Sequence, residues 1–150
     1  KTDIYLINGS TFSDSSEFCL RLCNKAFRAG HQIHIRTYAA HESEVLDRVL
    51  WERDKESFLP HKVISSTEIS AAESQSPPPI TISHQALSST QPAHKDLIIL
   101  LSPRAETEIE RFKRTALIVP NDPEQLDLAR AVYRQFKASG FDVNIHDLRR

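Results

Sequence analysis

Short, continuous apolar runs constrain the fold of this sequence more than any other feature. Asp3–Ile7, Asp96–Leu101 and Ala116–Val119 are such runs, whereas His31–Thr37 and Phe141–Ile145 alternate. A strand buried on both faces needs a continuous apolar run, which is typical of parallel sheets. Apolar residues recur with helical spacing at 14–29, 41–52 and 122–139, and a short helix is expected around 105–113. We therefore predict a single-domain Rossmann-like α/β fold, with a mainly parallel sheet and helices on both faces.

The chain is expected to form one domain over residues 1–150, a length that buries a sizeable core. Segments around 65–79 and 84–95 are rich in Ser, Thr, Gln and Pro, and are predicted to be surface loops. Between them, Ile80–Ser83 reads as a short strand. Because prolines crowd its start, we place this strand at the periphery of the sheet.

Composition narrows the classes of function. Charged residues make up 26% of the chain and the formal net charge is −1, so a basic surface wide enough to follow a phosphate backbone is not expected. Apolar runs stay well short of the ~20 residues that span a bilayer, and no signal segment opens the sequence. Cys19 and Cys23 do not suggest a disulfide framework. We expect a soluble, reduced, cytoplasmic protein without membrane contact.

A nucleotide-binding enzyme is the first alternative, because this fold class often binds nucleotides. The chain has three glycines, and the first strand–helix turn, Asn8–Ser13, lacks both glycine-rich phosphate-binding motifs. A nucleophile elbow is also missing. We therefore expect no catalytic residues and no cofactor. A direct nucleic-acid binder is a second alternative, and it would bind naked single strands with a steep salt dependence.

Cys19 and Cys23 with His31 and His34 resemble a zinc-ligand spacing. On a helical wheel, however, both cysteines fall among apolar residues, where free Cys behaves as a small hydrophobe. The two histidines open a strand and face solvent or a polar neighbour in this interpretation. We expect core packing and no metal site.

The helix predicted at 122–139 carries an apolar face that includes Ala129 and Tyr133. Beside this face lie Arg130, Arg134 and Lys137, and Val119 ends the preceding strand at the carboxyl edge of the sheet. An apolar patch next to arginines suits a peptide with an aromatic side chain and an anionic end. A solvated face of ordinary charged residues explains the pattern equally well.

Trp51, the single tryptophan, falls roughly 140° from Leu46 on its helix, away from the stripe formed by Leu46, Val49 and Leu50. A tryptophan outside the core stripe is typical of a protein interface. Alternatively, the charged loop at residues 52–56 folds back, so that Trp51 covers the edge of the core.

Two stretches resemble one known family. Leu46–His61, which contains LDRVLWERDKESFLPH, is similar to the LD-x-x-LW…ESF-x-PH signature of the chi subunit of bacterial DNA polymerase III. Ala116–Pro120, Gln125–Tyr133 and Ala138–Phe141 resemble the closing region of that family. The resemblance runs from end to end and is weakest across 65–95.

This resemblance implies a non-catalytic accessory subunit of the clamp loader, located at the replisome. Its implied partners are the psi subunit and the acidic, Phe-terminated tail of the single-stranded DNA-binding protein, through which it reaches DNA only indirectly. A helicase-like repair protein is a further candidate partner. By position, the psi-binding surface comprises Trp51, Phe58 and Pro60, and the tail pocket comprises Val119, Leu126, Arg130, Tyr133, Arg134 and Lys137. Leu126 departs from the basic residue found in some family members, and Arg134 and Lys137 are its expected substitutes.

Overall fold

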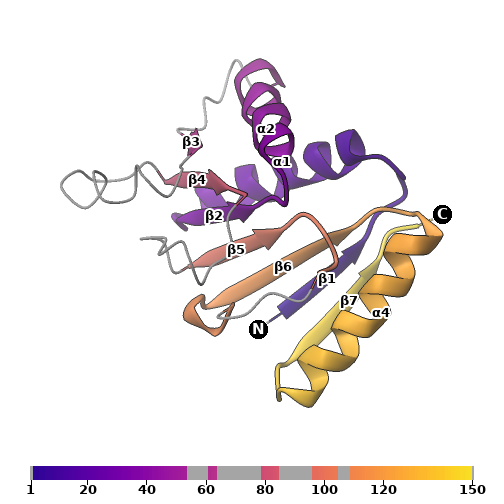
Figure 1. Ribbon diagram of the computed structural model, residues 1–150. Coiled ribbons are helices and arrows are strands. Elements are labelled where there is room, and N and C mark those ends of the chain that lie inside the picture. Colours follow the sequence, from indigo (N-terminus) through magenta and orange to yellow (C-terminus); the bar gives the residue numbers. More distant parts are fainter. Residues whose placement is uncertain (1, 54–60, 64–78, 85–95, 105–108, 150) are drawn as a thin grey trace.

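Seven parallel strands form one sheet in the computed structural model, which describes residues 2–53, 61–63, 79–84, 96–104 and 109–149 (Figure 1). The sheet order is β3-β4-β2-β5-β6-β1-β7, and every neighbouring pair is parallel. The strands are β1 Thr2–Leu6, β2 Ile33–Arg36, β3 His61–Val63, β4 Ile80–Ser83, β5 Leu97–Leu100, β6 Arg114–Val119 and β7 Val143–Asp147. The predicted parallel α/β fold is confirmed.

Helices cover both faces of this sheet, as predicted. Helices α1, Phe12–Arg28, and α2, Ala40–Arg53, pack on one face, while α4, Pro123–Ala138, packs on the other (Figure 1). Successive residues of β5 and β6 point to opposite faces, so the two faces belong to separate hydrophobic clusters. The continuous apolar runs therefore reflect strands that are buried on both sides.

The helix ends follow from local chemistry. Thr11 caps α1, and Asp14 returns the contact in a capping box, so the helix begins two residues before the expected span of 14–29. Asp122 caps α4 by accepting a hydrogen bond from the backbone N–H of Gln125, and the helix lies within the expected span of 122–139. Gly30 and Gly140 follow the two helices at φ +86° and +84°, a backbone region that glycine adopts without steric cost.

Two predictions about the middle of the chain need correction. Strand β4 is not peripheral, because it lies between β2 and β3 and all four of its residues are buried. The prolines precede β4, so every residue of the strand keeps its backbone N–H for pairing. Strand β3, His61–Val63, was not predicted, and it pairs with the outer edge of β4. Of the helix expected around 105–113, the structure describes 109–113, with one 3-10 turn at Ile109–Arg111. The predicted loops, apart from Pro79 and His84, lie outside the described residues.

Core packing of Cys19 and Cys23 is confirmed, since both are fully buried in the cluster beneath α1. His31 is exposed, whereas His34 is buried with its Nδ1 atom 2.8 Å from the hydroxyl of Thr81. The described ranges hold no group of three or more His, Cys, Asp or Glu side chains arranged for a metal ion. Nor does any described helix combine the length and apolar character needed to cross a membrane.

Candidate functional site

A pocket of about 320 Å³ lies between α4 and the strands β1 and β7. Its inner surface is apolar, and arginines lie around its opening. The apolar residues are Ile4, Leu6, Leu126, Ala129 and Ile145, and the remaining lining residues are Arg130, Tyr133, Arg134 and Arg149. A hollow of this kind, apolar inside and cationic outside, suits a ligand that joins an aromatic group to a negative charge.

Helix α4 creates the pocket by burying only part of its surface. Val132 and Phe136 anchor the helix in the core, while the small side chain of Ala129 keeps α4 close to the sheet. Tyr133 is half-buried at the boundary of this face. Arg130 lies one turn before Tyr133 and its side chain is 72% exposed. The helical spacing that suggested a mixed apolar and basic face is therefore present in three dimensions.

Four of the six residues predicted for this site come together in the pocket: Leu126, Arg130, Tyr133 and Arg134. Lys137 does not line it, but its ammonium lies 5.8 Å from the centre of the Tyr133 ring. Val119 must be corrected, because it is fully buried and cannot contact a ligand directly. Val119 pairs in register with Leu6, and Leu6 instead lines the pocket.

Sequence reasoning missed the contribution of the sheet and of the C-terminal residues. Ile145 is 52% exposed on the edge strand β7, and Arg149 follows that strand. The alternation of Val143 and Ile145 with polar residues was a usable signal, because it places both apolar side chains on one face of the strand. The proximity of Ile145 to α4, however, depends on β7 pairing with β1, which the sequence does not specify.

The charges around the opening leave a positive excess. Arg149 holds Asp147 through both guanidinium arms, with Nε–Oδ1 and Nη2–Oδ2 distances of 2.9 and 2.8 Å. These hydrogen bonds lower the pKa of Asp147 to about 2. Arg130 contacts Asp127 at 3.2 Å in a mutually exposed pair, which water screens strongly. Arg134 makes no ion pair in the part of the chain that the structure describes.

A second candidate surface surrounds Trp51. Leu46 and Leu50 of α2 are buried, whereas Trp51 is 53% exposed, so its predicted position outside the core stripe is confirmed. The Trp51 ring meets the edge of His61 at a centroid distance of 5.1 Å, and His61 Nε2 lies 3.0 Å from Asp47 Oδ1. Phe58 and Pro60 lie outside the described residues. Since α2 and α4 cover opposite faces of the sheet, the two surfaces are separate (Figure 1).

The turn after β1 is occupied by a carboxylate. Asp14 accepts hydrogen bonds from the Thr11 hydroxyl and amide at 2.8 and 3.1 Å, and these bonds hold the pKa of Asp14 below its usual value. A Cβ atom on Gly9 would lie 2.2 Å from Asp14 Cγ, so the carboxylate lies directly against this turn. A phosphate at this helix start would meet negative charge. This geometry argues against the nucleotide-binding alternative.

Comparison with known proteins gives one consistent family. The family model "DNA polymerase III chi subunit, HolC" matches residues 1–144. DNA polymerase III subunit chi of Pseudomonas aeruginosa is 28% identical over 150 residues, which cover 100% of this chain and 98% of that protein. The subunits chi of Haemophilus influenzae and Escherichia coli K12 are each 24% identical over 144 residues, covering 96% and 93% of this chain and 94% and 92% of theirs.

Among solved structures, T4 UvsW superposes with a TM-score of 0.67 at 8% sequence identity. The match covers 99% of this chain, which spans 41% of the UvsW chain. At this identity the likeness concerns the fold alone.

Proposed function

The chain belongs to the DNA polymerase III chi subunit family, and on this premise we propose that it is a non-catalytic adaptor of the clamp loader. It binds the acidic, Phe-terminated tail of the single-stranded DNA-binding protein in the α4 pocket, and a psi-type subunit at the Trp51 surface. The observation that carries the proposal is the convergence of Leu126, Arg130, Tyr133 and Arg134 around one apolar hollow.

The pocket matches such a tail in shape and charge. The terminal Phe ring fits among Leu126, Ile145 and Tyr133, and its burial contributes about 1.5–3 kcal/mol. The terminal carboxylate or a preceding Asp pairs with Arg130 or Arg134, and a charge-assisted hydrogen bond adds roughly 1.5–3 kcal/mol. Ordering a free tail and losing its translational freedom oppose these terms. Binding should therefore be weak and reversible, as suits an adaptor that follows a moving replisome.

Replacement of Arg130 tests the pocket. Arg130→Ala should weaken binding of a tail peptide by about 1.5–3 kcal/mol, because the bound peptide shields from water a guanidinium that is exposed in the free chain. Isothermal titration calorimetry measures this loss. Arg48→Ala is the matched control, since Arg48 is an exposed helical arginine on α2, on the other face of the sheet.

A second peptide separates the charge from the ring. The same tail with a C-terminal amide loses the carboxylate and keeps the Phe side chain. If the carboxylate pairs with Arg130, amidation should weaken binding to the unmodified chain and have little further effect on Arg130→Ala. Unchanged affinity of Arg130→Ala for the unmodified peptide would contradict the assigned pocket.

Trp51→Ala tests the second surface. Because Trp51 is 53% exposed, we expect the free energy of unfolding to change by less than about 1 kcal/mol. Binding of a psi subunit should be lost, while calorimetry with the tail peptide should show the affinity of the unmodified chain. Loss of tail binding with psi binding retained would mean that the two sites are exchanged.

A further inference from the structure

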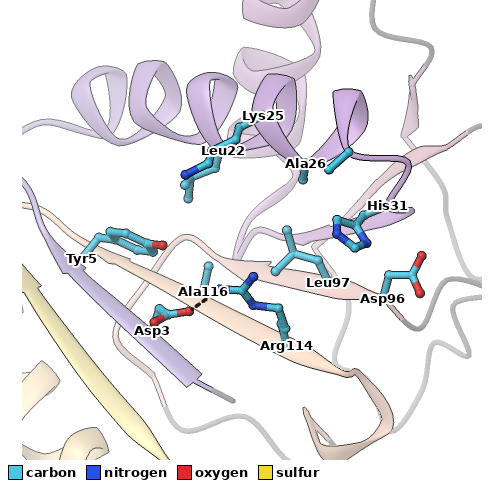
Figure 2. Close-up of a pocket in the computed structure, with 11 residues that line it drawn as sticks. Asp3, Tyr5, Leu22, Lys25, Ala26, His31, Asp96, Leu97, Arg114 and Ala116 are labelled. Atoms are coloured by element: carbon cyan, nitrogen blue, oxygen red, sulfur yellow. Dashed lines mark hydrogen bonds and ion pairs between the residues drawn. The ribbon is translucent and has the colours of Figure 1, made fainter.

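A second pocket lies between α1 and the sheet (Figure 2). It is on the face opposite the α4 pocket, because α1 and α4 pack on opposite faces of the sheet. It opens at the end of the sheet where β1, β5 and β6 begin, and its volume is about 160 Å³. Neither the proposed tail site nor the Trp51 surface uses it. A cavity of roughly 150 Å³ is large enough for a benzene ring, so this pocket has room for one small molecule.

Small side chains keep the pocket open. Ala26 of α1, Ala29 at the cap that follows α1 and Ala116 of β6 line it, and Leu22 and Leu97 complete its apolar walls. Larger residues at the three alanine positions would fill the space between helix and strand. The interior therefore offers apolar contacts to a compact ligand.

Hydrogen-bond donors gather at one side of this space. The side chains of Lys25, Tyr5 and Arg114 project from α1, β1 and β6 into the region between helix and sheet (Figure 2). Lys25 makes no ion pair with any described residue. Tyr5 is held in place by stacking on His146 at a centroid distance of 4.7 Å, and burial raises its pKa, so its hydroxyl keeps its proton.

The two carboxylates of the pocket are already engaged. Asp3 accepts hydrogen bonds from Arg114 Nη2 at 3.1 Å and from His146 Nε2 at 3.0 Å. Asp96 Oδ2 accepts a hydrogen bond from the backbone N–H of Gln32 at 2.9 Å, and Asp96 Oδ1 lies 3.5 Å from Lys113 Nζ. Among the residues that line the pocket, Lys25 and Arg114 balance Asp3 and Asp96, so the lining has no formal net charge when His31 is counted as neutral. Because Arg114 and Lys113 pair with the two acids, Lys25, an exposed residue, is the lining cation whose charge is left to meet an anion.

We propose that this pocket binds a small organic anion: a carboxylate held by Lys25, Tyr5 and Arg114, attached to an aromatic or branched apolar body that packs on Ala26, Leu97 and Ala116. Paired donors of this kind recognise a planar carboxylate, and the alanine-lined interior selects the body. The proposal stands independently of tail and psi binding, because no residue of the pocket belongs to either site.

The test uses benzoate as the probe and the full-length chain labelled with ¹⁵N. Titration followed by amide chemical shifts should give saturable changes centred on residues 25–31 and 114–116. Benzamide, which has the same ring without the charge, should bind at least about tenfold more weakly, since it loses the charge-assisted contacts. Inorganic phosphate should compete poorly because it lacks an apolar body.

Two substitutions locate the site. Lys25→Gln should weaken benzoate about tenfold and leave benzamide unchanged. Ala26→Leu should remove binding of both by filling the cavity. Arg28→Gln is the matched control, because Arg28 is an exposed cation in the same last turn of α1 and does not line the pocket; it should change benzoate affinity by less than about twofold.

Three outcomes would overturn the proposal. They are the absence of saturable shifts at millimolar benzoate, equal affinity for benzoate and benzamide, and shifts centred on Tyr133 and Arg130. An unaltered benzoate affinity in Lys25→Gln would likewise reject the assigned carboxylate position, even if Ala26→Leu fails to fold.

Discussion

Asp3→Asn is the substitution whose effect on stability the structure defines best. The Asp3 side chain is 5% exposed, and each carboxylate oxygen accepts one hydrogen bond, from Arg114 Nη2 and from His146 Nε2. Burial by itself would raise the pKa of Asp3. The hydrogen bonds from His146 and Arg114 outweigh it and lower the pKa below the ordinary value of 3.8. The native state therefore favours the charged carboxylate.

The size of the effect follows from what the substitution leaves behind. Removing one partner of a fully buried ion pair costs about 3–5 kcal/mol, because a charge remains buried and unpaired. Here the remaining partners, Arg114 and His146, are 50% and 43% exposed, so water can solvate both. We expect Asp3→Asn to lower the free energy of unfolding by about 2 kcal/mol at pH 7, or ~4–8 °C in Tm for a chain of this size.

The dependence on pH has a definite sign. Because the pKa of Asp3 is lower in the native than in the unfolded state, the unfolded chain binds more protons at acidic pH. The stabilisation by Asp3 is complete above the unfolded pKa, near pH 4, and is lost as the pH falls through the lowered native value. The difference between the unmodified chain and Asp3→Asn should therefore shrink as the pH falls below 4.

Urea unfolding at pH 7 and at stepped pH values below 4 measures both expectations. Asp127→Asn is the control, since Asp127 is 74% exposed in its pair with Arg130 and should change stability by less than about 1 kcal/mol. Equal stability of Asp3→Asn and the unmodified chain at pH 7 would refute the reasoning. A difference that grows toward acidic pH would show that the sign is wrong.

Two further predictions concern buried thiols and a helix end. Cys19 should resist thiol reagents such as Ellman's reagent in the folded protein and react in denaturant, because the hydrogen bond with Cys23 and burial raise its pKa; rapid native labelling would contradict this. Gly140→Ala should lower the free energy of unfolding by about 1 kcal/mol, measured by urea unfolding, because φ is +84° and residues with a side chain disfavour this region. A Cβ at this position would meet no atom, so the loss would come from the backbone conformation alone. Gly140→Asn should cost less because Asn tolerates this region, and equal losses would argue against backbone strain.

Prediction from sequence succeeded where the signal is local. The apolar runs gave the buried strands, the 3.6-residue period gave α1, α2 and α4, and the wheel placed Cys19 and Cys23 in the core and Trp51 outside it. Prediction from sequence failed where the position of a residue depends on contacts with segments that are distant in the chain. Strand β4 is interior because β3 pairs with its outer edge, and Val119 is buried although it ends a strand at the usual ligand-binding edge.

The candidate site shows the same division. Helical spacing alone brought Leu126, Arg130, Tyr133 and Arg134 to one side of α4, since residues three and four apart are neighbours on a helix. Ile4, Leu6, Ile145 and Arg149 complete the pocket from distant segments. Their contribution depends on strand order, and no local pattern encodes that order.

By itself the sequence determined the kind of fold, the helix faces and the family, because these depend on periodicity, capping and motif spacing within single segments. Only the tertiary structure decided the strand order and which distant segments contact one another. Strand β7 pairs with β1, so Ile145 lies close to α4 and helps to line its pocket. Helix α1 packs on the other face, where it forms a pocket with Asp3, Tyr5 and Arg114. Pockets form between segments far apart in the chain, and their shape follows from long-range packing that local patterns do not specify.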